Sequence, residues 1–189
     1  MELDRDWALL RAALAELKDY LLSNELYHPL NLPALRSGGA QTSQLTIGNL
    51  LLSQVRISAA LDVAHQAAYQ DLEKQIRETR ATWRSNWSRK AGKEFISRLN
   101  LWSQHLHELQ ADLSGQAAYF PTEVRQRAIL QLLQPEMIEG VPAIENEQLH
   151  RLDEVLREVS RPDQFVWEPD LAKSFPSDKF WFLYITLKL

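Results

Sequence analysis

The sequence predicts an all-α fold, an up-and-down helical bundle of about five helices with an aromatic-rich C-terminal segment packed across it. Leu and Ala number 32 and 19, whereas Val and Ile together number 15. Only six Gly and eight Pro interrupt the 189 residues, so long helices with few turns are favoured. Apolar residues also recur at the spacing of a helix with one buried face. We expect one helical domain over 1–189, with the core bundle at about 3–160 and the aromatic segment at about 162–189.

The first predicted helix runs from about residue 3 to residue 24. Six apolar residues fall on one stripe at alternating spacings of four and three: Leu3, Trp7, Leu10, Leu14, Leu17 and Leu21. Pro29 and Pro33 prevent the helix from extending much further. The residues 24–42 are then a long connection.

The region 43–114 predicts two further helices. A single helix of this length would be too long for a compact domain, and only Gly92 is a strong interruption. The polar run 85–92 is the best place for a turn, which gives a second helix at about 43–87 and a third at about 91–114. A kink near Asp62 is the alternative. The third helix repeats the stripe of the first, with Phe95, Leu99, Trp102, Leu106, Leu109 and Leu113.

Two shorter helices and an aromatic tail complete the chain. Pro121 and Pro135 bracket a fourth helix, and a fifth at about 145–161 ends before Pro162. The last 28 residues hold seven of the seventeen aromatic side chains. The final stretch 179–189 fits a helix or a strand, and we favour the helix.

Composition excludes several functional classes. With no cysteine, the chain has no disulfide, thiolate metal site, iron–sulfur cluster or cysteine nucleophile. A formal charge of −4 argues against a surface that binds nucleic acid throughout. Acidic residues occupy the N-terminus in place of the basic region of a signal peptide, and polar residues interrupt the apolar stretch around 50–52. We expect a cytoplasmic protein that does not span a membrane.

The segment 74–98 is the main concentration of charge, with eight basic and two acidic residues. Cations interleaved with tryptophans are typical of surfaces that bind single-stranded nucleic acid or phosphate groups. The candidate binding residues are Arg77, Arg80, Trp83, Arg84, Trp87, Arg89, Lys90 and Lys93. Helical geometry favours a different interpretation, because Trp83 and Trp87 share a stripe with Ile76 and so resemble core residues. The flanking arginines would then pair with acids of other helices.

A metal site is the next hypothesis, because helical bundles build carboxylate sites from Glu-x-x-His pairs and single glutamates. Glu25 and His28 have this spacing but lie where the first helix must end. His105 and His107 are roughly 200° apart on a helix and point in different directions. Asp62 and His65 remain as candidates, with His65 placed on a core face. A lone inward histidine is more often a core residue than a ligand, so we expect neither metal nor cofactor.

The aromatic tail is a candidate interaction surface. Its residues either cover their own bundle or supply anchors for a second chain: Trp167, Phe180, Trp181, Phe182 and Tyr184. Helices with seams of this kind also self-associate, so we expect a protein partner or a homodimer. No serine lies in a G-x-S-x-G turn, and the residues 38–43 lack the Gly-Lys of a phosphate-binding loop.

The sequence therefore favours a non-enzymatic protein with a structural or protein-interaction role. The first alternative is binding of nucleic acid or a phosphate ligand through 74–98, and the second is a metal-dependent bundle enzyme. The sequence does not select among partners, ligands or biological processes.

Overall fold

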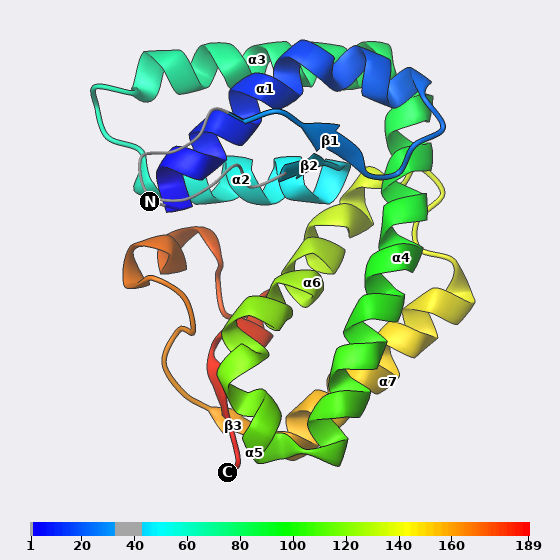
Figure 1. Cartoon of the computed structure of the whole chain (residues 1–189), viewed down its shortest axis with the longest axis vertical. Helices are drawn as coiled ribbons and strands as arrows, with labels where there is room; N and C mark the ends of the chain where they lie inside the picture. The colour runs from blue at the N-terminus through cyan, green and yellow to red at the C-terminus, as the bar shows by residue number, and fades with distance from the viewer. Residues whose placement is uncertain (1, 33–42) are drawn as a thin grey trace. The chain divides into compact units, whose positions relative to one another are not determined.

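The structure, a computed structural model, describes residues 2–32 and 43–189 and confirms the all-α class (Figure 1). Helices, 3₁₀ turns included, account for 73% of the described residues. This part of the chain holds seven α-helices, where the sequence predicted about five. The chain divides into two compact units, Met1–Glu94 and Phe95–Leu189, here called the N-terminal and C-terminal units. Among the described helices, none has the length and apolarity needed to cross a bilayer.

The N-terminal unit is built from α1 (Glu2–Leu22), α2 (Ile47–Ala60), α3 (Gln66–Thr82) and the start of α4 (Arg84–Ala111). The first predicted helix is confirmed, and it buries Leu10, Leu17 and Leu21. Strands β1 (His28–Leu30) and β2 (Ser43–Leu45) pair antiparallel, with His28 opposite Leu45. The predicted connection 24–42 is described only as far as residue 32.

The breaks in the region 43–114 differ from the prediction. The second predicted helix is divided at 61–65, near the predicted alternative kink, where the Asp62 carboxylate accepts a hydrogen bond from the His65 amide at 2.8 Å. No turn forms at 85–92, which is part of α4. The chain instead changes direction at Trp83, whose ψ of 35° leaves the helical range (Figure 1). The short polar residues within 85–88 therefore lie in a helix and do not form a loop.

Helix α2 is capped by residues from two parts of the chain. Its N-cap residue Thr46 accepts a hydrogen bond from the Asn49 amide at 3.1 Å. The buried Glu94 carboxylate accepts another from the Gly48 amide at 2.8 Å. A carboxylate is favourable here because the first amides of a helix have no partner within the helix and carry partial positive charge.

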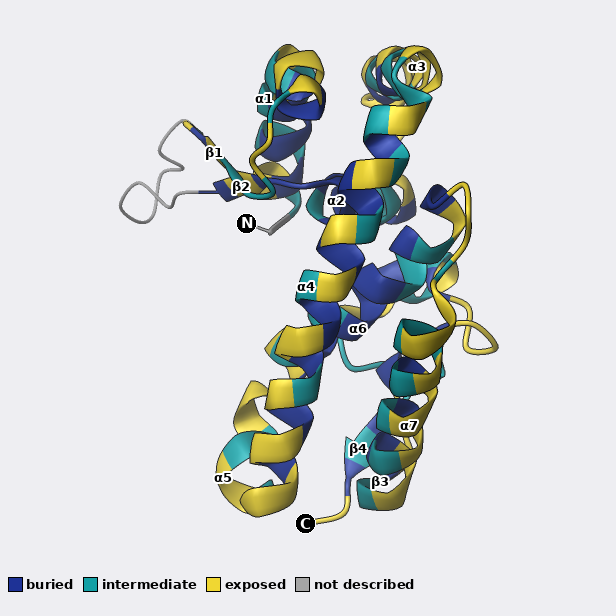
Figure 2. Ribbon diagram, turned by 90° about the vertical axis from the view of Figure 1, so that its right-hand side faces the viewer, coloured by how far each residue is buried: buried dark blue, intermediate teal, exposed yellow. Residues whose placement is uncertain are grey.

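The C-terminal unit contains the rest of α4, then α5 (Leu113–Gln116), α6 (Phe120–Leu133) and α7 (Ala143–Val159). The predicted fourth and fifth helices are confirmed as α6 and α7. Figure 2 shows buried residues along one side of α4 and exposed residues along the other. Five of the six residues of the predicted third stripe are buried there, namely Phe95, Leu99, Trp102, Leu106 and Leu109.

The helix that we favoured for 179–189 is wrong. These residues form a 3₁₀ turn, η4 (Trp181–Leu183), and then β4 (Ile185–Leu187), which pairs antiparallel with β3 (Ser160–Pro162). A further backbone hydrogen bond follows this strand pair, in which Lys188 N donates to Val159 O at 2.9 Å. The β-branched and aromatic content of this stretch therefore outweighed its helical signals.

Candidate functional site at the end of helix α1

The structure distributes the residues of the predicted basic site over different environments. Trp87 and Lys90 are buried, whereas Trp83, Arg80 and Arg84 are half-buried. The exposed members are Arg77, Arg89 and Lys93. Arg80 lies over the Trp87 ring at 5.7 Å from its centroid. The eight candidates therefore do not form one exposed surface.

Three polar side chains of α4 instead turn toward the C-terminal end of α1. Asn86 donates to the Leu21 carbonyl at 3.1 Å, and Arg89 donates to the same oxygen at 3.4 Å. Lys90 donates to the Ser23 hydroxyl at 3.1 Å and also to the Glu25 carbonyl. Helix α1 has no basic residue in its own last turn. Asn86 and Arg89 therefore satisfy a terminal carbonyl of α1, and the charges of Arg89 and Lys90 interact favourably with the negative end of the α1 dipole.

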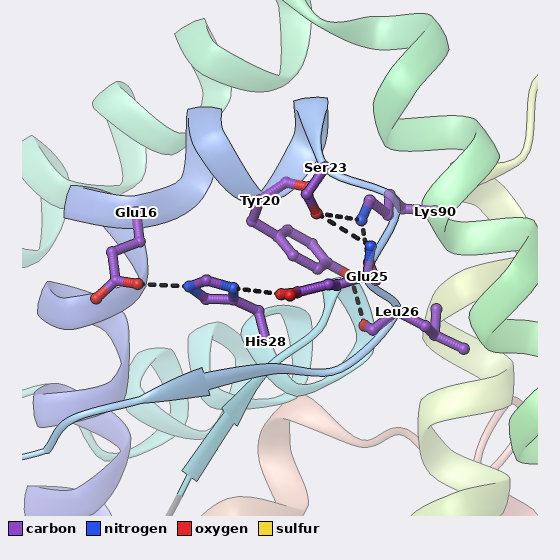
Figure 3. A network of polar contacts seen from close by, with 7 residues as sticks. All are labelled: Glu16, Tyr20, Ser23, Glu25, Leu26, His28 and Lys90. Atoms are coloured by element: carbon purple, nitrogen blue, oxygen red, sulfur yellow. Dashed lines mark hydrogen bonds and ion pairs between the residues drawn. The ribbon is translucent and has the colours of Figure 1, made fainter.

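Lys90 is the most unusual group of this site, with only 2% of its surface exposed. Its ammonium lies 4.1 Å from the centroid of the Tyr20 ring, a cation–π contact. Burial, followed by the nearby charges of Arg89 and Lys93, lowers the Lys90 pKa to about 8. The amine is thus held by two oxygens and an aromatic face (Figure 3).

A histidine between two glutamates lies beside the lysine. His28 Nε2 is 2.6 Å from Glu16 Oε2, and His28 Nδ1 is 2.9 Å from Glu25 Oε2 (Figure 3). Hydrogen bonds to Glu25 and then to Glu16 raise the His28 pKa above its ordinary value. In the sequence, the spacing of Glu25 and His28 fits a metal motif, but it lies where the first helix ends. The partner Glu16 is on another element and is not identified by spacing alone.

The chemistry of these groups is that of a structural network. Ser23 and Lys90 have the contact distance of a nucleophile and its base. However, the Ser23 hydroxyl donates to the Tyr20 carbonyl at 2.9 Å and accepts from the Glu25 amide at 3.2 Å. The serine proton is therefore directed away from the lysine. A single metal ion could not use both glutamates together with His28, because the two ring nitrogens point in opposite directions.

The predicted metal candidates lie on the surface. Asp62 and His65 are both exposed, and Asp62 Oδ1 is 2.6 Å from His65 Nδ1. The placement of His65 on a core face is wrong, because the helix breaks at 61–65 and the ring lies outside, 5.8 Å from that of Trp7. The hydrogen bond from the His65 side chain lowers the Asp62 pKa. Over residues 2–32 and 43–189, no three histidine, aspartate or glutamate side chains gather as a metal site would need.

The aromatic tail packs within the C-terminal unit. Phe180 and Phe182 are buried, and Trp167, Trp181 and Tyr184 are half-buried. Trp167 Nε1 donates to the Pro121 carbonyl at 2.8 Å, and the Tyr184 hydroxyl donates to the Phe175 carbonyl at 2.8 Å. Arg157 lies over the Trp181 ring at 4.0 Å. The five residues predicted to contact a partner thus pack against other residues of the C-terminal unit.

The connection between α6 and α7 is the site that sequence reasoning missed. We call residues 137–147 the α6–α7 corner. Ile138 and Ile144 are 59% and 75% exposed there, on either side of Gly140, whose φ of 74° makes the turn. Glu139 and Glu147 are exposed nearby. The available signal was Ile138 in a Gly- and Pro-containing connection, together with Ile144 directly after Pro142 and Ala143, at the start of α7.

Comparison with models of known protein families, with curated proteins and with solved structures finds no match to this chain.

Proposed function

We propose that this protein is a non-enzymatic protein-interaction module, and that its α6–α7 corner is the contact surface. The observation that carries this proposal is the pair of exposed isoleucines, Ile138 and Ile144. Large aliphatic side chains that are exposed to solvent stabilise a fold little, whereas at an interface they bury apolar surface. The action of the module in the cytoplasm stays a prediction from the sequence.

Charge indicates the kind of partner. Exposed Glu139 and Glu147 border the isoleucines, and residues 95–189 carry fourteen acidic against nine basic side chains. A partner with an apolar surface and basic borders is complementary. Residues 1–94 carry twelve basic and eleven acidic side chains, with Arg77 and Lys93 exposed. A second copy of the chain therefore offers suitable cations and is the partner that we expect.

The test is the mass of the particle in solution, measured by light scattering during size exclusion. We expect a dimer for the natural chain and a monomer for the double variant Ile138→Ser, Ile144→Ser. Val63→Ser is the matched control, since Val63 is 89% exposed in the connection between α2 and α3 and its replacement should leave the dimer intact. Added salt should weaken the dimer if the charges contribute. If the natural chain stays monomeric at about 100 μM, self-association through the α6–α7 corner is excluded as the function of this surface.

Binding of nucleic acid or a phosphate ligand is the second candidate, and the exposed cations Arg77, Arg89 and Lys93 favour it. Its affinity for single-stranded DNA should fall steeply with salt. The double variant Arg77→Glu, Lys93→Glu should abolish retention of such DNA, while Ile138→Ser should not. Unchanged retention in the charge-reversal variant contradicts this candidate.

A further inference from the structure

We propose that His28 is a proton-dependent switch, which fastens the connection 23–30 to helix α1 when protonated and loosens it when the proton leaves. The two contacts of the ring tie together two elements. Glu16 belongs to α1, whereas Glu25 and His28 belong to the connection and to β1. We call this arrangement the Glu16–His28–Glu25 bridge (Figure 3).

The geometry favours a protonated ring. A carboxylate only accepts hydrogen bonds, and both ring nitrogens face a carboxylate oxygen, at 2.6 Å and 2.9 Å. A neutral imidazole has one donor nitrogen, so it could satisfy only one of the two glutamates. The imidazolium has two donors and completes both contacts as charge-assisted hydrogen bonds. One proton is therefore coupled to closure of the bridge.

The charged groups around the ring support this assignment. Glu16 and Glu25 are in direct contact with it, and their hydrogen bonds raise the His28 pKa. From α4, Lys90 is the opposing cation, but its ammonium lies over the face of Tyr20, a ring centred 6.2 Å from that of His28. From β2, the residue opposite His28 is the uncharged Leu45. The two carboxylates are thus the nearest charges.

Loss of the proton affects more than one side chain. Residues 25 and 26 are otherwise held through their carbonyl oxygens, which accept from Lys90 and from the Tyr20 hydroxyl, the latter at 3.0 Å. The Glu25 side chain has the His28 ring as a donor. Release of Glu16 removes a tie between β1 and α1, and release of Glu25 removes a tie between β1 and the connection that precedes it. In either case hydrogen exchange at β1 should increase.

The first test is nitrogen-detected NMR of the His28 ring in the full chain. We expect the His28 pKa to lie above 6.5 and both ring nitrogens to be protonated at pH values below that pKa. Glu16→Gln and Glu25→Gln should each lower that pKa, because each replaces a carboxylate with a neutral amide. Glu154→Gln, an exposed position on α7, is the matched control and should leave it unchanged. A pKa at or below 6.5, or one that neither glutamine variant lowers, overturns the proposal.

The second test measures opening directly, by hydrogen exchange at the backbone amides of His28 and Leu30, since Pro29 has no amide hydrogen, after correction for the intrinsic effect of pH. Exchange should increase about tenfold as pH rises through the His28 pKa, the factor expected for one lost charge-assisted contact. The increase should vanish in Glu16→Gln, because the neutral ring can still donate to Glu25 through Nδ1 while the side-chain amide at position 16 donates to Nε2. If the protection from hydrogen exchange is the same below and above the His28 pKa, the bridge does not hold β1 in place and the proposal is wrong. This outcome is independent of oligomeric state, so it distinguishes the switch from the proposed interaction function.

Discussion

Each unit of the molecule joins two of its helices with a buried Arg–Asp pair, and the two pairs differ in what surrounds them. In the N-terminal unit, Arg56 Nε donates to Asp6 at 2.8 Å, and Ser53 donates to the other carboxylate oxygen at 2.7 Å. In the C-terminal unit, Arg127 donates to both oxygens of Asp153, at 2.7 Å and 2.9 Å. The first pair joins α1 to α2, and the second joins α6 to α7.

The difference that the described contacts show is an aromatic ring beside the second pair. Ser53 and Arg56 belong to the same helix, so their bonds to the Asp6 carboxylate join α1 to α2. The Arg127 guanidinium also lies 4.4 Å from the centroid of the Phe182 ring in η4. It thus contacts the tail as well as α7. An ion pair of this kind adds little net stability by itself, but removal of one partner leaves a buried charge, which is costly.

The largest effect is expected for Asp153→Ala. The variant leaves the buried Arg127 guanidinium without its carboxylate, and we expect a loss of about 3–5 kcal/mol in the free energy of unfolding. Urea denaturation followed by circular dichroism measures this loss. Asp163→Ala removes an exposed carboxylate and should change stability by less than about 0.5 kcal/mol. A similar small change in Asp153→Ala would show that water reaches the arginine.

Asp6→Ala should have the second largest effect. It leaves Arg56 and Ser53 without this acceptor, and we expect a loss of about 3 kcal/mol. The loss of protection in hydrogen exchange should be confined to the N-terminal unit, whereas Asp153→Ala should affect the C-terminal unit. Equal loss in both units would contradict the division of the chain at residue 94.

Phe182→Leu should separate the packing of the tail from the ion pair. The variant keeps an apolar side chain in a fully buried position but removes the aromatic face beneath Arg127. We expect a loss of about 1–2 kcal/mol, from imperfect packing and the missing cation–π contact. Repeating the substitution in an Arg127→Met, Asp153→Leu background removes the cation. A smaller loss there measures the coupling, and an equal loss indicates packing alone.

The smallest effect concerns pH, and its sign should differ between the units. The His28 pKa is raised, so protonation of His28 contributes stability below pH 6.5 that is lost as pH rises through the raised pKa. Burial lowers the His105 pKa, and Nε2 of this ring has no hydrogen-bond partner among the described residues. The unfolded chain therefore binds a proton at His105 more readily. Its contribution is complete above pH 6.5 and is lost as pH falls through the lowered pKa.

Unfolding measured between pH 5 and pH 8 checks this contrast. The variant His105→Gln should lessen the loss of stability in acid, and His28→Gln should lessen the loss above neutral pH. Exposed His150 is the control, and His150→Gln should alter neither slope. A shift of the same sign in both variants contradicts the assignment.

Local sequence patterns predict much of the fold. The apolar stripes predicted α1 and the buried side of α4, and prolines predicted where α6 and α7 lie. The break at 61–65 is weakly signalled because this stretch contains no Gly or Pro, although the short side chain of Asp commonly accepts hydrogen bonds from nearby backbone amides in turns. The polar residues of 85–92 favour a turn on sequence grounds. Their polarity instead serves contacts to α1, which lies 65 to 68 residues earlier.

The candidate site could not be derived in the same way. Charge counting identified the segment 74–98, but not that Lys90 points inward while Arg77 and Lys93 remain exposed. For Lys90 and Lys93 that distinction depends on which side of α4 faces α1, and for Arg77 it depends on how α3 packs. Both are set by contacts between residues far apart in the sequence. Glu16 and His28 likewise meet through the reversal of the chain after α1.

The capping of α1 by α4 also has a consequence for synthesis of the chain. The Leu21 carbonyl receives its donors from Asn86 and Arg89. Translation adds about 5–20 residues per second, so several seconds separate the appearance of this helix end from the appearance of its cap. During this interval the last turn of α1 depends on water for its hydrogen bonds. The N-terminal unit can therefore reach its final stability only after the start of α4 has been made, and a pause before residue 86 would prolong the frayed state of α1.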